Sequence, residues 1–175
     1  AGAIATTTRA EAVAGSSYGE VLVAQGGAAP YAWAVTAGSL PAGLALSTGG
    51  ELSGVPQAVG SFSFTVGATD SSTGTGPFTA SQAYTLEVAA PALSAGDVTT
   101  NVGYNATATA IVLDIQGEAT SVAIVSAPAH GTATASGTTI TYQPVAGYVG
   151  ADSFTYRAVG PYSSSAAATV EINVA

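Results

Sequence analysis

Apolar and polar residues alternate with a period of two along much of this chain. In the clearest run, which follows Gly60, the apolar members are Phe62, Phe64, Val66 and Ala68, and Ser63, Thr65 and Gly67 separate them. A period of two places successive side chains on opposite faces of a strand, so one face packs on a core and the other meets solvent. The run therefore predicts a half-buried β-strand.

Glycine and proline interrupt the chain too often for long helices. Between residues 40 and 60 they are Pro41, Gly43, Gly49, Gly50, Gly54, Pro56 and Gly60. Proline lacks a backbone N–H, and glycine favours turns and bulges over regular elements. The segment predicts short strands joined by turns, and the same punctuation elsewhere predicts an all-β chain.

A Phe-bearing strand motif occurs twice, about ninety residues apart. Residues 61–64 read Ser-Phe-Ser-Phe and residues 153–156 read Ser-Phe-Thr-Tyr, and a proline-containing turn precedes each. This spacing favours two similar β-sandwiches over a short-period solenoid. We predict domains at residues 1–89 and 90–175, joined by a linker at residues 89–91 that is short enough to make the pair a semi-rigid rod.

The same alternation predicts the strands of both domains. In the first, residues 4–14 predict an opening strand that switches sheets around Arg9, and Trp33 falls on the third strand, where sandwiches bury an aromatic residue. Exposure of Trp33 as a platform for a sugar is the alternative. In the second domain the predicted strands are Leu93–Val102, Ala106–Ile115, Ser121–Val125, Gly131–Ala135, Thr138–Gln143, Asp152–Val159 and Ser165–Val174.

Two sets of motifs carry a resemblance to known families. The first half, with Leu40-Pro-Ala-Gly-Leu44 and Gly54-Val-Pro56, resembles the bacterial immunoglobulin-like repeats related to cadherin-like domains. The second half, with Tyr142-Gln-Pro144 and Gly147-Tyr-Val-Gly150, resembles a sister family of cadherin-like repeats. The resemblance implies two tandem immunoglobulin-like β-sandwiches in a large surface or secreted bacterial protein, with neighbouring repeats as partners and no shared enzymatic activity.

Composition narrows the possible partners. Ten acidic residues against two arginines give a net charge of −8, so there is no cationic surface for nucleic acid or an anionic membrane. Without cysteine, disulfides and thiolate metal sites are excluded. No apolar stretch is long enough to insert into a membrane. With only 7% charged residues, the surface suits a monomeric spacer.

Two arrangements would support hydrolysis, and we expect neither to act. His130 with Ser126 or Ser136 and Asp114 has the residue types of a catalytic triad, but no nucleophile elbow accompanies them. A turn histidine that precedes a strand is the favoured interpretation. Asp114 and Glu118 could form a glycosidase pair, but a small sandwich lacks the necessary cleft. We therefore predict that the chain is not an enzyme.

The acidic residues are scattered singly along the chain, whereas a calcium site needs several clustered oxygens. We expect no cofactor. The weak calcium candidates are Asp97, Asp114 and Glu118.

These patterns predict a non-catalytic stalk of an adhesin-like protein at the bacterial cell surface or outside the cell. The alternative is a module that binds a glycan or a host protein through loops at the tip of the first domain, because sandwiches often bind ligands through grouped loops. The loops are residues 25–30, 47–50 and 70–79. The candidate ligand contacts are Gln25, Asp70, Ser71, Thr73 and Thr75.

Overall fold

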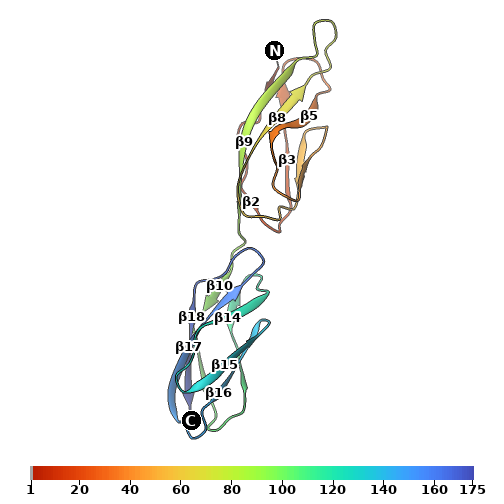
Figure 1. The fold of residues 1–175 in the computed structure, drawn as a ribbon. Coiled ribbons are helices and arrows are strands. Elements are labelled where there is room, and N and C mark those ends of the chain that lie inside the picture. Colours follow the sequence, from red (N-terminus) through yellow and green to blue (C-terminus); the bar gives the residue numbers. More distant parts are fainter. Residues whose placement is uncertain (1) are drawn as a thin grey trace. The chain divides into compact units, whose positions relative to one another are not determined.

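The computed structural model describes residues 2–175, and Ala1, the first residue of the predicted first domain, lies outside them. The described residues form strands, turns and loops without a helix, which confirms the all-β prediction. The chain divides into two compact units, Ala1–Ala90 (unit one) and Pro91–Ala175 (unit two). Figure 1 shows that each unit is built from packed layers of strands.

Unit one contains three sheets. Its strands are β1 (Ala3–Ile4), β2 (Ala12–Val13), β3 (Tyr18–Val21), β4 (Ala24–Gln25), β5 (Ala32–Gly38), β6 (Leu44–Leu46), β7 (Glu51–Gly54), β8 (Gly60–Thr69) and β9 (Thr79–Ala89). The sheet orders are β2-β9-β8-β5, β3-β7-β6 and β1-β4. The first two sheets form the two layers of the sandwich, and β1-β4 extends the second layer at one end.

The opening strand of unit one changes sheets as predicted. Ala3 pairs with Gln25 in the β1-β4 sheet, whereas Ala12 pairs in parallel with Val88 in the four-stranded sheet. Arg9 lies in the crossing segment between β1 and β2. The switch lets one segment complete both layers.

The core of unit one follows the alternation in the sequence. In β8 the side chains of Phe64, Val66 and Ala68 are buried, while Ser61 and Ser63 face solvent. Trp33 in β5 is only 5% exposed, which confirms its prediction as a core residue. Gly50 lies against the Trp33 ring with a φ of +93°, and a Cβ at this glycine would contact Nε1 of the ring at 2.8 Å.

Unit two repeats the strand order of unit one. Its strands are β10 (Ser94–Gly96), β11 (Val98–Val102), β12 (Thr109–Ile111), β13 (Asp114–Gln116), β14 (Ser121–Ser126), β15 (Gly131–Ser136), β16 (Thr139–Pro144), β17 (Gly150–Val159) and β18 (Ala168–Val174). The sheet orders are β11-β18-β17-β14, β12-β16-β15 and β10-β13. Each strand of unit two therefore has its counterpart nine strands earlier.

Two strands predicted as continuous in unit two are each divided in two. The predicted strand Leu93–Val102 breaks at Asp97, because β10 pairs with β13 and β11 pairs with β18. The predicted strand Ala106–Ile115 divides into β12 and β13, which belong to different sheets. In both cases the chain moves from one sheet to another, and a break in pairing accompanies that move.

Large side chains fill the core of unit two. Tyr142, Phe154 and Tyr156 are at most 1% exposed and belong to a single buried cluster. The Tyr156 hydroxyl donates to the carbonyl oxygens of Gly96 and Asp114, at 2.9 and 3.1 Å. This tyrosine therefore joins β17 to the small β10-β13 sheet.

Candidate functional site

The tip of unit one brings together two of the loops that sequence analysis grouped there. Asp70, at the end of β8, is 6% exposed and accepts hydrogen bonds from the backbone N–H groups of Phe78 at 2.8 Å and of Ala28 at 3.3 Å. Its Oδ1 atom also accepts one from the Ser72 hydroxyl at 2.7 Å. The carboxylate thus fastens loop 26–31 to loop 70–78.

These hydrogen bonds stabilise the charged form of Asp70. The bond from Phe78 N–H contributes most and the Ser72 hydroxyl next, and together with the other donors they lower the pKa of Asp70 from 3.8 to about 2. Gly27 has a φ of +82° and approaches this carboxylate so closely that a Cβ at that position would collide with it. Asp70 is therefore an organising residue of the tip.

The other candidate ligand contacts differ in their environment. The Ser71 hydroxyl donates to the carbonyl oxygens of Ala28 and Ala29, at 3.0 and 2.8 Å, so it also joins the two loops. Gln25 is exposed at the end of β4. Thr73 and Thr75 are exposed in loop 70–78.

His130 lies in the turn before β15, as its interpretation as a turn histidine predicted. Its ring stacks on Tyr148 at 4.2 Å between centroids with an angle of 9° between planes. Ser126 Oγ lies 2.6 Å from the Thr155 hydroxyl, and Asp114 Oδ1 accepts from Gln116. The polar groups of the hypothetical triad thus engage other neighbours.

Asp152 is a buried carboxylate that sequence analysis did not single out. It is 8% exposed and accepts hydrogen bonds from the Tyr142 hydroxyl at 2.7 Å and from the N–H groups of Ala129 and His130 at 3.0 Å. Burial raises its pKa, but these donors and the Ser153 N–H outweigh burial and lower it. The signal in the sequence was an aspartate at an inward position of the alternating strand β17.

Burial and the neighbouring carboxylate also shift the pKa of Tyr142. Burial is the larger cause, and the hydrogen bond to Asp152 adds to it, so the pKa of Tyr142 is raised. Tyr142 therefore stays a protonated donor and Asp152 an ionised acceptor.

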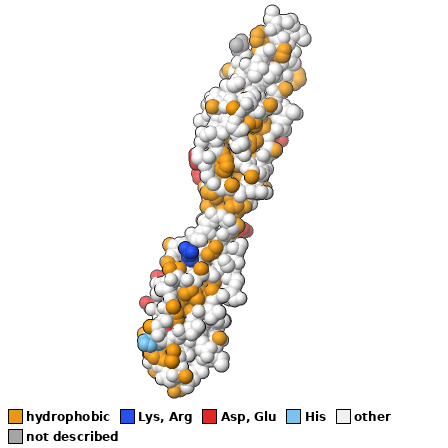
Figure 2. Space-filling view, viewed as in Figure 1, with side chains coloured by type: hydrophobic (Ala, Val, Ile, Leu, Met, Phe, Trp, Pro, Cys, Tyr) orange, Lys and Arg blue, Asp and Glu red, His pale blue; other side chains and the backbone are white. Residues whose placement is uncertain are grey.

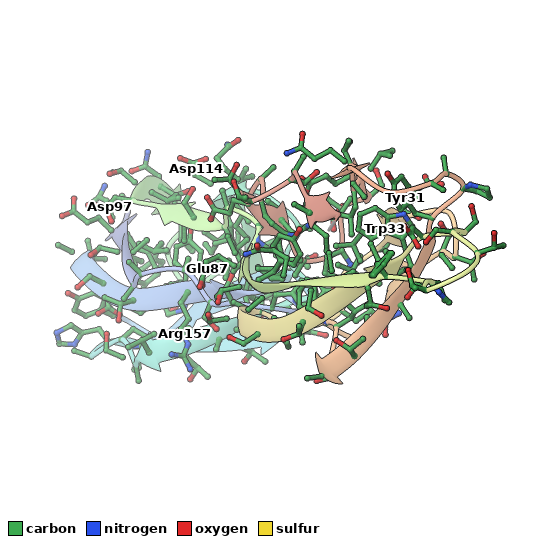
Figure 3. All side chains as sticks on the ribbon, turned by 90° about the horizontal axis from the view of Figure 1, so that it is seen from above. Tyr31, Trp33, Glu87, Asp97, Asp114 and Arg157 are labelled. Carbon is green, nitrogen blue, oxygen red and sulfur yellow. The ribbon has the colours of Figure 1, made fainter. Side chains whose placement is uncertain are left out.

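The weak calcium candidates are placed in different surroundings. Asp97 Oδ1 accepts a hydrogen bond from the Thr169 N–H at 2.7 Å, and Asp114 accepts one from Gln116 at 3.2 Å. Figure 3 labels both aspartates. Glu118 is exposed in the loop after β13. Within residues 2–175, His, Asp and Glu side chains form no group of three that could hold a metal ion.

Unit one also contains a partly buried ion pair. The Arg9 side chain is 3% exposed and its Nη1 lies 2.7 Å from Glu20 Oε2, which also accepts from the Tyr18 hydroxyl. The guanidinium lies 4.1 Å above the centre of the Tyr84 ring. Burial, followed by the Glu20 carboxylate, raises the pKa of Tyr18. Arg9 therefore acts as a core side chain between the layers.

Family comparisons agree with this architecture. Residues 2–89 match the family model described as "Putative Ig domain", and residues 88–173 match the one described as "Bacterial Ig domain". The chain belongs to these immunoglobulin-like families. The matches confirm the resemblance inferred from the motifs and identify the chain as a tandem of bacterial immunoglobulin-like modules, of a structural or adhesion type. No curated protein matches the chain.

Several solved structures are similar to the chain at 20% identity or less. An endo-fucoidan hydrolase of glycoside hydrolase family 107 is 20% identical with a TM-score of 0.41, over 99% of this chain and 29% of its own. Drosophila N-cadherin is 11% identical with a TM-score of 0.37, over 82% of this chain and 42% of its own. Mouse cadherin-23 is 12% identical with a TM-score of 0.39, over 99% of this chain and 64% of its own. The chain thus spans less than two thirds of each. Residues 2–175 contain no helix long and apolar enough to cross a bilayer.

Proposed function

We propose that this tandem is a non-catalytic spacer in a larger adhesin-like protein at the bacterial cell surface or outside the cell. The observation that carries the proposal is the route of the chain through each unit. In unit one, Ala3 pairs beside loop 26–31, whereas Ala89 leaves beside Val13, and Gly15 N–H donates to Pro56 at the same end. The chain therefore enters the unit at one end and leaves it at the other, as a spacer requires.

The surface supports the same proposal. Charged side chains are sparse on the face in Figure 2, and only 7% of all residues are charged. The outward positions of the long strands carry mostly serine and threonine, such as Ser63 and Thr85, whose hydroxyls lie 3.3 Å apart. A surface of small hydroxyl side chains stays hydrated and does not steer charged partners.

Pulling the whole chain between its termini with an optical trap tests the spacer proposal. We expect two separate unfolding steps, each lengthening the chain by roughly 250–300 Å, because each unit has its own core and about ninety residues. The parallel strand pairs oppose this force in shear. Unit one has two residue pairs between β2 and β9, and unit two has five between β11 and β18, so unit one should yield first. Gradual extension without steps would contradict the proposal.

A binding function at the tip of unit one is the second candidate. Asp70 and Ser71 hold loops 26–31 and 70–78 in one arrangement, and a preorganised loop loses less entropy when it binds a partner. Arrays of glycans and of host extracellular proteins would test it with the wild type and with Thr73→Ala/Thr75→Ala. A signal that the double variant abolishes would support the tip. A signal that it leaves unchanged would exclude it.

A further inference from the structure

A hollow of about 520 Å³ opens on unit two, over the outer face of the four-stranded sheet. Small-molecule sites occupy roughly 300–1,000 Å³, so the hollow has the size of such a site. Its floor comes from β11, β17 and β18, and one wall comes from the turn before β15. The spacer function gives this hollow no role.

The floor is a row of polar side chains. Strand pairing aligns Thr99 with Glu171 and Glu171 with Ser153, and all three residues are exposed. Neighbouring strands lie about 4.8 Å apart, so the row is about 10 Å long. Asn173 stands on the same face, two residues farther along β18. The floor thus presents hydroxyl, carboxylate and amide groups together.

The wall carries an aromatic surface. His130 is exposed and stacks on Tyr148 at 4.2 Å, and the Tyr148 hydroxyl donates to the Ala151 carbonyl at 2.5 Å. Figure 2 shows the histidine, in pale blue, at the surface of unit two beside apolar side chains. An apolar ligand face could lie against this ring while its polar groups reach the floor.

The wall is also fixed in place before any ligand arrives. Asp152 accepts hydrogen bonds from the backbone N–H groups of Ala129 and His130, both at 3.0 Å, and from the Tyr142 hydroxyl. These bonds fasten the turn to β17. A site whose walls are already ordered loses less conformational entropy on binding.

Charge selects the class of ligand. The lining residues include Asp152 and Glu171 and no lysine or arginine, and the chain has a net charge of −8, so anionic ligands are disfavoured. Two carboxylates, one of them already hydrogen-bonded, are too few for a calcium site. A ligand with many neutral hydroxyl groups and a flat apolar face fits both the floor and the wall.

We propose that this hollow is a binding site for a neutral saccharide. Its hydroxyl groups contact Thr99, Glu171 and Ser153, and one face of its ring lies against His130. The site is separate from the loops at the tip of unit one and does not depend on the spacer function.

Binding of neutral oligosaccharides to the whole chain tests the proposal. The probes are arrays of gluco-, xylo-, manno- and galacto-oligosaccharides, with sulfated and uronate glycans for comparison, and calorimetry then measures the strongest neutral signal. Glu171→Ala should weaken binding at least tenfold, since hydrogen bonds to a charged group are the stronger ones. Ser153→Trp should abolish binding by filling the hollow. His130→Ala should weaken binding at least fivefold, and His130→Phe should restore it.

Thr85→Ala in unit one is the matched control, because Thr85 pairs with Ser63 as Glu171 pairs with Ser153. It should leave the affinity unchanged. The substituted residues are exposed, and the melting temperature of each variant checks its folding. Three results would overturn the proposal: no retained neutral saccharide, retention of anionic glycans alone, or a neutral signal that survives Ser153→Trp. The unfolding steps of the spacer test are unaffected by any of these outcomes.

Discussion

Units one and two share one strand order but close their sandwiches differently. In unit one the chain crosses between layers over residues 5–11, and β2 then pairs with β9 at two positions. In unit two the crossing takes only Asp97, and β11 pairs with β18 at five positions. The comparison shows that a short crossing leaves more residues for the parallel pair that joins the second and last strands of a unit.

The longer crossing segment of unit one, residues 5–11, includes Arg9, whose charged side chain lies in the space between the layers. Counting back from the pairs Ala12–Val88 and Val102–Val174, Thr99 takes the place of Arg9. Thr99 is exposed on a regular strand, whereas the Arg9 side chain turns inward over Tyr84 and pairs with Glu20. The same fold thus accepts either a paired strand or an inserted guanidinium at this position.

At matching strand positions, the two units also differ in whether the side chains are polar or apolar. Phe62 and Asp152 are each the third residue of their strands, β8 and β17, and Gly54 and Tyr142 are each the fourth of theirs, β7 and β16. Unit one therefore has an apolar ring and a glycine at the two strand positions where unit two has a carboxylate and a phenol. In unit two the phenol donates to the carboxylate at 2.7 Å, so neither of these two side chains can be replaced alone without leaving the other unpaired.

The largest expected effect comes from removing the carboxylate of unit two. Asp152→Ala leaves the Tyr142 hydroxyl and two turn N–H groups without their acceptor, and buried unpaired donors are costly. We expect a loss of about 4 kcal/mol in the free energy of unfolding of unit two. Hydrogen exchange of the β16 and β17 amides measures it.

Asp152→Asn keeps one acceptor oxygen, so its loss in the free energy of unfolding should be less than half of that of Asp152→Ala. Phe62→Ala at the matching position should destabilise unit one and leave exchange in unit two unchanged. Equal losses for Asp152→Ala and Asp152→Asn would show that packing, and not hydrogen bonding, is what this residue contributes.

The second effect concerns the buried arginine of unit one. Arg9→Ala removes the partner of Glu20 and opens a cavity over Tyr84, so we expect a loss of about 3 kcal/mol. Trp33 is the sole tryptophan and is buried in unit one, so its fluorescence during urea unfolding reports this unit alone.

The double variant Arg9→Met/Glu20→Gln should recover most of that loss, because an apolar side chain of similar length fills the space without an unpaired charge. Arg9 Nε and Nη2 are buried without a hydrogen-bond partner among the described residues, which adds to the cost of keeping the charge. A double variant as unstable as Arg9→Ala would mean that the ion pair itself stabilises unit one.

A smaller effect is expected in acid. The folded state lowers the pKa of Asp70 from 3.8 to about 2, so its contribution to stability is complete above pH 3.8 and is lost as the pH falls towards 2. The melting temperature of unit one, followed by Trp33 fluorescence, should fall over this window. In Asp70→Asn the melting temperature of unit one should depend less on pH over this window. Glu51→Gln, which changes an exposed carboxylate, should leave that dependence as in the wild type. The same slope in wild type and Asp70→Asn would contradict the assignment.

The smallest effect tests the exposed faces. The Ser61 hydroxyl donates to Glu87 at 2.6 Å on the outer face of unit one, and unit two has Ala151 at the matching position of β17. Ser61→Ala should change the free energy of unfolding by less than about 0.5 kcal/mol, because the hydrogen bond is exposed to water. If urea unfolding shows that Ser61→Ala loses more than about 1 kcal/mol of the free energy of unfolding, the serine of unit one cannot be replaced by the alanine that unit two has at the matching position.

Sequence alternation predicted features that depend on one strand at a time. Burial of Phe64 and Val66, the core position of Trp33 and the change of sheets around Arg9 all follow from local patterns. The repeat was recognised, but its alignment was wrong by two residues. By strand position, Phe64 corresponds to Phe154, whereas the motifs had matched Phe62 with Phe154.

The features that could not be predicted depend on residues from two elements. Asp152 is stable in the core because Tyr142, in the facing sheet, and the turn at His130 supply donors. Asp70 and Ser71 were proposed as ligand contacts, but their hydrogen-bonding atoms fasten two loops together. The hollow above Glu171 likewise requires three strands and a turn in register, which no single stretch of sequence reveals.

The parallel pairing of the second and last strands in each unit also bears on how genes for such proteins grow. A coding segment for one unit can be duplicated or deleted in frame, because its product needs no new crossover and disturbs no neighbouring sheet. Phe62 in unit one and Asp152 in unit two occupy the same strand position, so one strand order accepts different side chains there. The order of strands therefore does not fix the chemistry of the core that they enclose.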